Sequence, residues 1–208
     1  MFKIYFINFR LPGSTAGVDA SYEPDWLLSK LSEYFSVWLP QPQLESFTQV
    51  AGYTYSWIPG FRIISFPSPL CLTYNFWLWM DWSDPGNMLV WLIEQLLQAE
   101  AANEKVHILS HVPPGNAECL GAWGREYSKI ISRFEDTIVG QFHGHTHYDH
   151  FVIHYDPNNS SRPTNVGYIS PSVATYTGLS PGYRIYHVDK ASFKVSTLII
   201  KAHNINSY

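Results

Sequence analysis

The sequence predicts a mixed α/β (α+β) fold, because helical and strand-like patterns alternate in its first half and only strand-like patterns follow in its second. Its 208 residues are 46% hydrophobic and 14% charged, which is typical of a globular chain with a sizeable core. This length fits one or at most two domains. We therefore expect a sandwich of two sheets whose inner faces are buried, with helices packed outside.

The first predicted elements are a helix and a hairpin. Gly, Pro and Ser are frequent in residues 11–23, which is typical of a loop, and Asp25 can then cap a helix that extends to about Trp38. Prolines at positions 40 and 42 should stop that helix, because proline has no backbone N–H to donate. Residues 52–57 and 61–66 are expected to form two strands of a hairpin that turns at Pro59-Gly60.

Two helix–strand units follow the hairpin. A helix is expected over Pro85–Ala102, since proline is tolerated at the first helical position and apolar residues at helical spacing come after it. The short apolar run at 105–111 is a predicted strand. The same order is repeated by a helix at 123–133 and a strand at 137–142.

The remainder of the chain is strand-like. Turns rich in Pro, Asn and Gly separate four short runs, which we expect to form a β meander. The four runs are Phe151–Tyr155, Val166–Ser170, Tyr183–Val188 and Phe193–Ile200.

A histidine-rich stretch is the main candidate for a functional site, since five of the nine histidines lie between positions 143 and 154. His145 and His147 follow Gly144 just past a predicted strand, where open α/β sheets place ligands. Residues two apart in an extended segment point to the same side, so these imidazoles would converge on a metal ion. His111 ends the preceding predicted strand, and parallel pairing would bring all three together. A histidine that only forms hydrogen bonds in a loop remains the alternative for each.

Charge and composition limit the class of partner. The formal net charge is −4 and no run of Lys or Arg occurs, so nucleic acid is not the expected partner. Aromatic residues make up 16% of the chain and cluster at 53–57 and 74–82, either as core or interface packing or as a surface for lipid or sugar. No apolar run is long enough to span a membrane, and residues 1–10 lack the features of a signal peptide.

Two features favour an oxidising, secretory compartment. Cys71 and Cys119 can form at most one bridge, with two free thiols as the alternative. Asn158 and Asn159 begin overlapping glycosylation sequons in a predicted polar turn, although such sequons also arise by chance. The combination is typical of secreted or lysosomal proteins.

Two motifs resemble the last two metal motifs of the calcineurin-like metallophosphoesterases. They are Ser110-His111-Val112-Pro113-Pro114-Gly115 and Gly144-His145-Thr146-His147. The tail from Pro171 to Tyr186, with Thr-Tyr-Thr-Gly-Leu-Ser-Pro-Gly-Tyr at 175–183, is similar to that of the acid sphingomyelinases. The resemblance implies a partial metallophosphoesterase-type β-sandwich flanked by helices. Residues 21–208 would be the carboxyl-terminal half of a catalytic domain, and residues 1–20 match nothing in the family.

The resemblance also implies roles for individual residues. His111 and His145 would bind one zinc ion, His147 would bind a second, and Tyr176 would line the site for the substrate phosphate. The implied disulfide joins Cys71 to Cys119. The implied reaction is zinc-dependent hydrolysis of sphingomyelin to ceramide and phosphocholine at a membrane surface, by a monomeric secreted or lysosomal protein.

The sequence departs from the family in its metal motifs. The Asp-x-His, Gly-Asp and Gly-Asn-His motifs, which in the family supply the other ligands, the bridging aspartate and the catalytic histidines, do not occur in this sequence. Three histidines divided between two ions leave each zinc with fewer than the usual three protein ligands of a catalytic site. We therefore expect no catalytic residue in this chain, weak zinc binding and no turnover. A catalytically inactive remnant, a binding protein, or a related phosphodiesterase acting on nucleotides are the alternatives.

Overall fold

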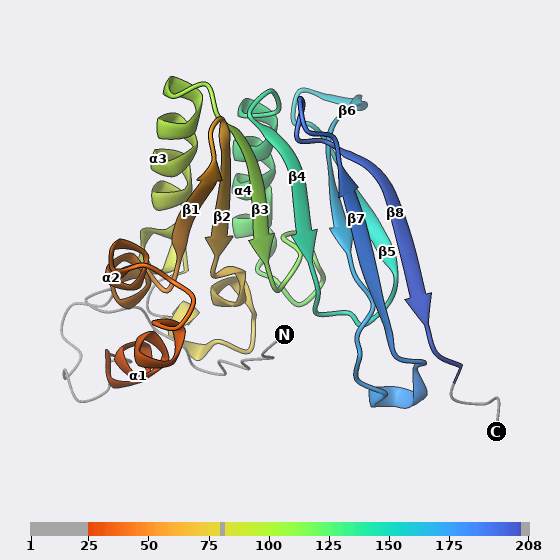
Figure 1. Ribbon diagram of the computed structural model, residues 1–208, viewed down its shortest axis with the longest axis horizontal. Coiled ribbons are helices and arrows are strands. Elements are labelled where there is room, and N and C mark those ends of the chain that lie inside the picture. Colours follow the sequence, from red (N-terminus) through yellow and green to blue (C-terminus); the bar gives the residue numbers. More distant parts are fainter. Residues whose placement is uncertain (1–24, 80–81, 205–208) are drawn as a thin grey trace.

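A computed structural model describes residues 25–79 and 82–204 of the protein (Figure 1). The predicted loop at 11–23 and the unmatched segment 1–20 lie outside the described residues. A six-stranded sheet in the order β1-β2-β3-β4-β6-β5 forms the centre of the structure, in which β2, β3, β4 and β6 are parallel and the outer strands β1 and β5 are antiparallel to their neighbours. The strands are β1 Tyr53–Ile58, β2 Phe61–Phe66, β3 Lys105–Ser110, β4 Ile138–His143, β5 His150–Asp156 and β6 Asn159–Ile169.

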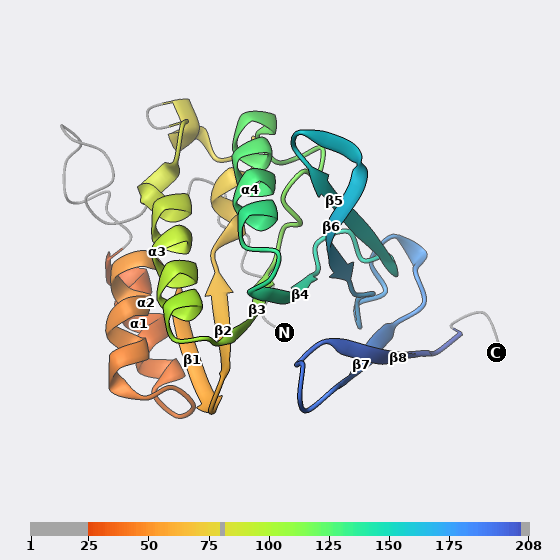
Figure 2. The ribbon, with the colours of Figure 1, turned by 90° about the horizontal axis from the view of Figure 1, so that it is seen from above.

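Helices α3 (Met88–Ala101) and α4 (Gly121–Arg133) cover one face of this sheet, as Figures 1 and 2 show. Each helix buries one stripe against the strands, which confirms the predicted amphipathic pattern. In α3 the buried residues are Met88, Leu89, Leu92, Leu96 and Ala99, and in α4 they are Trp123, Gly124, Tyr127, Ile130 and Ile131. None of the helices in the described ranges is both long and apolar enough to cross a membrane.

A hairpin of β7 (Gly182–Val188) and β8 (Val195–Ala202) lies on the opposite face of the sheet (Figure 2). Tyr186 of β7 packs edge-on against Phe142 of β4, with ring centroids 4.8 Å apart. The His107 ring of β3 forms a hydrogen bond of 2.7 Å to the carbonyl oxygen of Phe193, in the turn between the two hairpin strands. The protein is therefore built of helices, a mixed sheet and a smaller second sheet, which confirms the mixed α/β prediction.

The first helical region differs from the prediction. Helix α1 (Asp25–Phe35) ends before Trp38, and a second helix, α2 (Gln41–Val50), begins immediately after Pro40. Pro40 occupies the N-cap position of α2 with φ −63°, and Pro42 lies in its first turn. Because the first N–H groups of a helix have no intrahelical acceptor, proline is tolerated there. Interpreting the two prolines only as a stop was therefore wrong, since they also begin a helix.

The start of α3 is also shifted from Pro85 to Met88. Gly86 and Asn87 adopt left-handed backbone conformations, with φ values of 66° and 55°, so the helix cannot extend back through them. The carboxylate of Asp84 instead accepts hydrogen bonds from the amides of Leu89 and Val90, at 2.8 and 3.1 Å. The aspartate thus satisfies N–H groups of the first turn.

The predicted β meander is wrong in its pairing. Strands β5 and β6 form an antiparallel pair, but β6 lies beside β4 and continues the parallel sheet, while β7 and β8 alone form the second sheet. The period-two pattern gives the face of a side chain but not the neighbour of a strand, because pairing depends on contacts distant in sequence.

Candidate metal centre

The pairing of β3 with β4 places the predicted site residues at one edge of the sheet. These strands are parallel, with Ile108 opposite Gln141 and Leu109 opposite Phe142, so their carboxyl ends meet at the lower edge of the sheet in Figure 1. The amide of Gly144 donates a hydrogen bond of 3.0 Å to the carbonyl of His111, which joins the two loops after the strands. The rings of His111 and His145 lie edge to face, with centroids 5.2 Å apart. The prediction that these strands are parallel neighbours is confirmed.

The backbone of the histidine stretch is not extended. His145 and His147 have φ values of 75° and 66°, in the left-handed region that non-glycine residues rarely adopt. The amide of Thr146 donates to the carbonyl of Gly144 at 3.0 Å, which makes the turn tight. The argument from period-two spacing was therefore wrong for the backbone of this turn, and the assignment of the two histidines as metal ligands stays a prediction. Non-glycine residues at positive φ are enriched at functional sites.

His147 lies beside the predicted substrate-binding residue. The rings of His147 and Tyr176 are 5.9 Å apart between centroids, and Tyr176 belongs to a short 3-10 turn, Tyr176–Gly178, between β6 and β7. The Tyr176 side chain is exposed. The structure thus brings the predicted residues together as two pairs, His111 with His145 and His147 with Tyr176.

A carboxylate that the sequence analysis did not identify contacts the site. An oxygen of the Glu118 carboxylate lies 2.5 Å from Nε2 of His145. The other ring nitrogen of His145, Nδ1, is buried and has no hydrogen-bond partner within the described chain. Glu118 belongs to no recognisable motif, and only the fold of the loop after His111 brings it to this position.

The residues present fit part of a metal centre. A buried imidazole nitrogen without a partner, beside a second imidazole, is a suitable pair of nitrogen donors for zinc. Within residues 25–79 and 82–204, however, no group of three or more His, Cys, Asp or Glu side chains gathers closely enough to hold a metal ion. The donor set of the described residues is therefore partial.

The predicted disulfide between Cys71 and Cys119 is present, with Cα atoms 4.9 Å apart. Backbone hydrogen bonds on both sides of it join the same two segments: Leu120 donates to Cys71 at 2.7 Å, and Thr73 donates to Glu118 at 2.8 Å. The bridge therefore ties the aromatic segment that begins at Tyr74 to the loop that carries Glu118.

Two other histidines of the stretch lie in the core. His143 is buried at the end of β4 and forms a hydrogen bond of 2.7 Å to the hydroxyl of Ser110, and burial lowers its pKa to about 3. Burial likewise lowers the pKa of His154, on β5, to about 4. Both rings are therefore neutral at pH 7, as expected for histidines that pack in a core.

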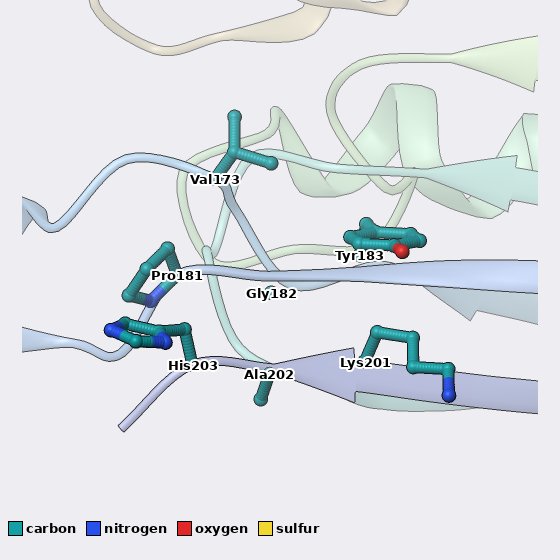
Figure 3. Close-up of a pocket in the computed structure, with 7 residues that line it drawn as sticks. All are labelled: Val173, Pro181, Gly182, Tyr183, Lys201, Ala202 and His203. Carbon is teal, nitrogen blue, oxygen red and sulfur yellow. The ribbon is translucent and has the colours of Figure 1, made fainter. Parts of the chain in front are cut away.

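Two other surface features include none of the residues paired above. Asn158 and Asn159 are exposed at the turn between β5 and β6, and their glycosylation stays a prediction. Figure 3 shows a pocket of about 270 Å³ at the end of the β7–β8 hairpin, to which Val173, Pro181 and His203 contribute side chains. No predicted site residue lines it.

The fold resembles that of a solved phosphatase. A dimetal phosphatase from Danio rerio has a similar fold, with a TM-score of 0.52 and 12% identity over 82% of this chain and 64% of that one. The described part of the protein is thus a partial dimetal-phosphatase fold. No protein-family model matches the chain.

By sequence, the chain is homologous to the sphingomyelin phosphodiesterases. It is 40% identical over 178 residues to the sphingomyelin phosphodiesterase of Bos taurus and 38% identical over 186 residues to that of Homo sapiens. The matches include 86% and 89% of this chain, but only 28% and 29% of the bovine and human proteins. The chain therefore spans less than a third of the length of these relatives.

Proposed function

We propose that this chain supplies three metal ligands to a two-zinc sphingomyelin phosphodiesterase of greater length. In this proposal His111 and His145 bind one zinc ion and His147 binds the second. The observation that carries the proposal is the pairing of His111 with His145, whose ring centroids are 5.2 Å apart. The two residues follow the ends of adjacent parallel strands, in a chain homologous to these enzymes. Residues 21–208 would then be one half of a catalytic domain.

In this proposal the residues of this chain bind the zinc ions and orient the substrate phosphate. Two zinc ions, when bound, would activate a water molecule and hold the phosphate. His111 and His145 would present ring nitrogens from the loops that follow β3 and β4. Tyr176, exposed beside His147, has a hydroxyl that can donate a hydrogen bond to a phosphate oxygen. Protonation of the leaving ceramide alkoxide needs a further acid, which we assign to the part of the protein outside this chain.

The exposed aromatic segment supports a lipid substrate. Tyr74, Phe76, Trp79 and Trp82 are all exposed, and Trp79 is 84% accessible. The described part of this segment lies near the same sheet edge as the histidine pairs (Figure 1). Since Trp and Tyr side chains prefer the boundary between water and lipid, we propose that this segment meets the membrane that holds sphingomyelin.

A matched pair of tryptophans tests the lipid contact. Replacing Trp79 with Ala should weaken sedimentation of the protein with sphingomyelin–phosphatidylcholine vesicles. Trp57 is 55% accessible on β1, whose end lies at the opposite edge of the sheet, and Trp57→Ala should leave vesicle binding unchanged. Equal binding by both variants and the unaltered protein would contradict the assignment.

The disulfide and the exposed sequons support a secretory location, because disulfides persist in oxidising compartments. We infer that the longer protein is secreted or lysosomal.

The experiment that tests the function uses the longer protein. It should release phosphocholine from sphingomyelin vesicles in the presence of zinc, and His145→Ala should abolish that release. Preference for a nucleotide phosphodiester over sphingomyelin would assign the protein to a different substrate class. The isolated 208-residue chain should show no turnover, as expected of a partial donor set.

A further inference from the structure

The carboxylate of Glu118 offers a function beyond the ligand set. Glu118 lies in the loop after His111, directly before Cys119, and its side chain is 43% accessible. One carboxylate oxygen lies 2.5 Å from Nε2 of His145, and the other lies 3.2 Å from the hydroxyl oxygen of Tyr74. An ionised carboxylate can only accept hydrogen bonds, so both the His145 ring and the Tyr74 hydroxyl must donate to it.

This contact determines which nitrogen of His145 carries the proton. If Nε2 donates to Glu118, the lone pair of the neutral ring is on Nδ1. Nδ1 of His145 is buried and has no hydrogen-bond partner within the described part of the chain. The lone pair of the His145 ring is therefore on a buried nitrogen, Nδ1. The same ring packs against the ring of His111.

We propose that Glu118 is a positioning residue of the metal site: it holds His145 in the Nε2–H tautomer and so presents Nδ1 to the zinc ion shared with His111. This rests on the proposed function. A carboxylate that accepts the second N–H of a metal-bound histidine fixes its orientation and increases its basicity as a ligand.

Glu118 is itself held from two sides. Its backbone carbonyl accepts hydrogen bonds from the amide of Thr73, at 2.8 Å, and from the hydroxyl of that threonine, at 3.2 Å. The adjacent disulfide fixes the loop further. The negative charge of Glu118 raises the pKa of Tyr74, so the phenol keeps its proton and remains a donor. Because Thr73 contacts the backbone of Glu118, a side-chain substitution at Glu118 leaves this loop contact in place.

Nuclear magnetic resonance of the metal-free chain tests the hydrogen bond directly. The His145 ring N–H should give a proton signal that exchanges slowly with water, and His145→Ala identifies it. Glu118→Ala should remove that signal, while Glu126→Gln, on the exposed surface of α4, should retain it. A signal that persists in Glu118→Ala would overturn the proposal.

Zinc titration of the same variants tests the consequence. Glu118→Ala should weaken zinc binding by roughly 10- to 100-fold, and Glu118→Gln, which retains an acceptor oxygen, should weaken it less. Tyr74→Phe removes one donor but keeps the carboxylate on His145, so it should have a smaller effect than Glu118→Ala. Unchanged affinity in Glu118→Ala, with the ring signal lost, would overturn the positioning role alone. If the unaltered chain binds no zinc, the proposed ligand set itself fails, and the metal-directed role of Glu118 fails with it.

Discussion

The disulfide between Cys71 and Cys119 should account for a large part of the stability of the described chain. It closes a loop with a sequence separation of 48 residues. On the chain-entropy model, closing a loop of this length removes unfolded-state entropy that corresponds to about 4 kcal/mol at 25 °C. The bridge is surrounded by hydrogen bonds that do not need it, including that from Leu120 to Cys71. The double variant Cys71→Ala, Cys119→Ala should therefore keep the fold and lose stability.

Thermal unfolding followed by circular dichroism measures this loss. For a chain of this size, the double variant should melt about 10 °C below the oxidised protein. The unaltered chain treated with reductant is the matched control, and it should melt close to the double variant. A variant that melts within about 3 °C of the oxidised protein would refute the argument. A mass spectrum of a non-reduced digest should show the two cysteine peptides linked.

Two further predictions concern buried polar groups. The Tyr127 hydroxyl donates a hydrogen bond of 2.7 Å to the Gln141 side chain in the core. Tyr127→Phe should therefore lower the free energy of unfolding by about 1–3 kcal/mol. The control Tyr148→Phe, on the surface, should not change it. The pKa values of His143 and His154 in the folded protein, about 3 and about 4, lie below the usual 6.5, so the unfolded chain binds more protons as the pH falls. The contribution of these two groups to the free energy of unfolding is fully present above pH 6.5. It should decrease by roughly a few kcal/mol as the pH falls towards 3. Urea midpoints measured between pH 7.5 and pH 4 test this sign, and a midpoint that rises on acidification would contradict it.

Local patterns in the sequence predicted the elements better than their arrangement. The hairpin β1–β2, the helices α3 and α4 and the strand ends that carry the histidines follow from periodicity and turn residues within short windows. The start of α2 was missed because Pro40 can either stop a helix or begin one, and the residues alone do not separate the two. The position of β6 beside β4 depends on pairing between distant segments, which no local pattern contains.

In the candidate site, too, the sequence predicted individual residues better than their arrangement. His111, His145 and His147 could be selected from their motifs, yet the left-handed turn that orients two of them was not predictable from period-two spacing. Glu118 could not be selected at all, because its contact with His145 depends on a loop that the disulfide at Cys119 and the hydrogen bond from Thr73 hold in place. Residues that act through another side chain leave little trace in a single sequence.

Zinc titration calorimetry of this chain tests the central claim most directly. The unaltered chain should bind zinc weakly, and the triple variant His111→Ala, His145→Ala, His147→Ala should lose that binding, because these nitrogens are the proposed ligands. The matched control, His187→Ala with His203→Ala, changes two histidines outside the cluster and should bind zinc like the unaltered chain. Because a histidine must be deprotonated to bind metal, the affinity should also fall as the pH decreases through about 6.5. Equal zinc affinity in the triple variant and the unaltered chain would contradict the assignment of these three histidines to the metal site.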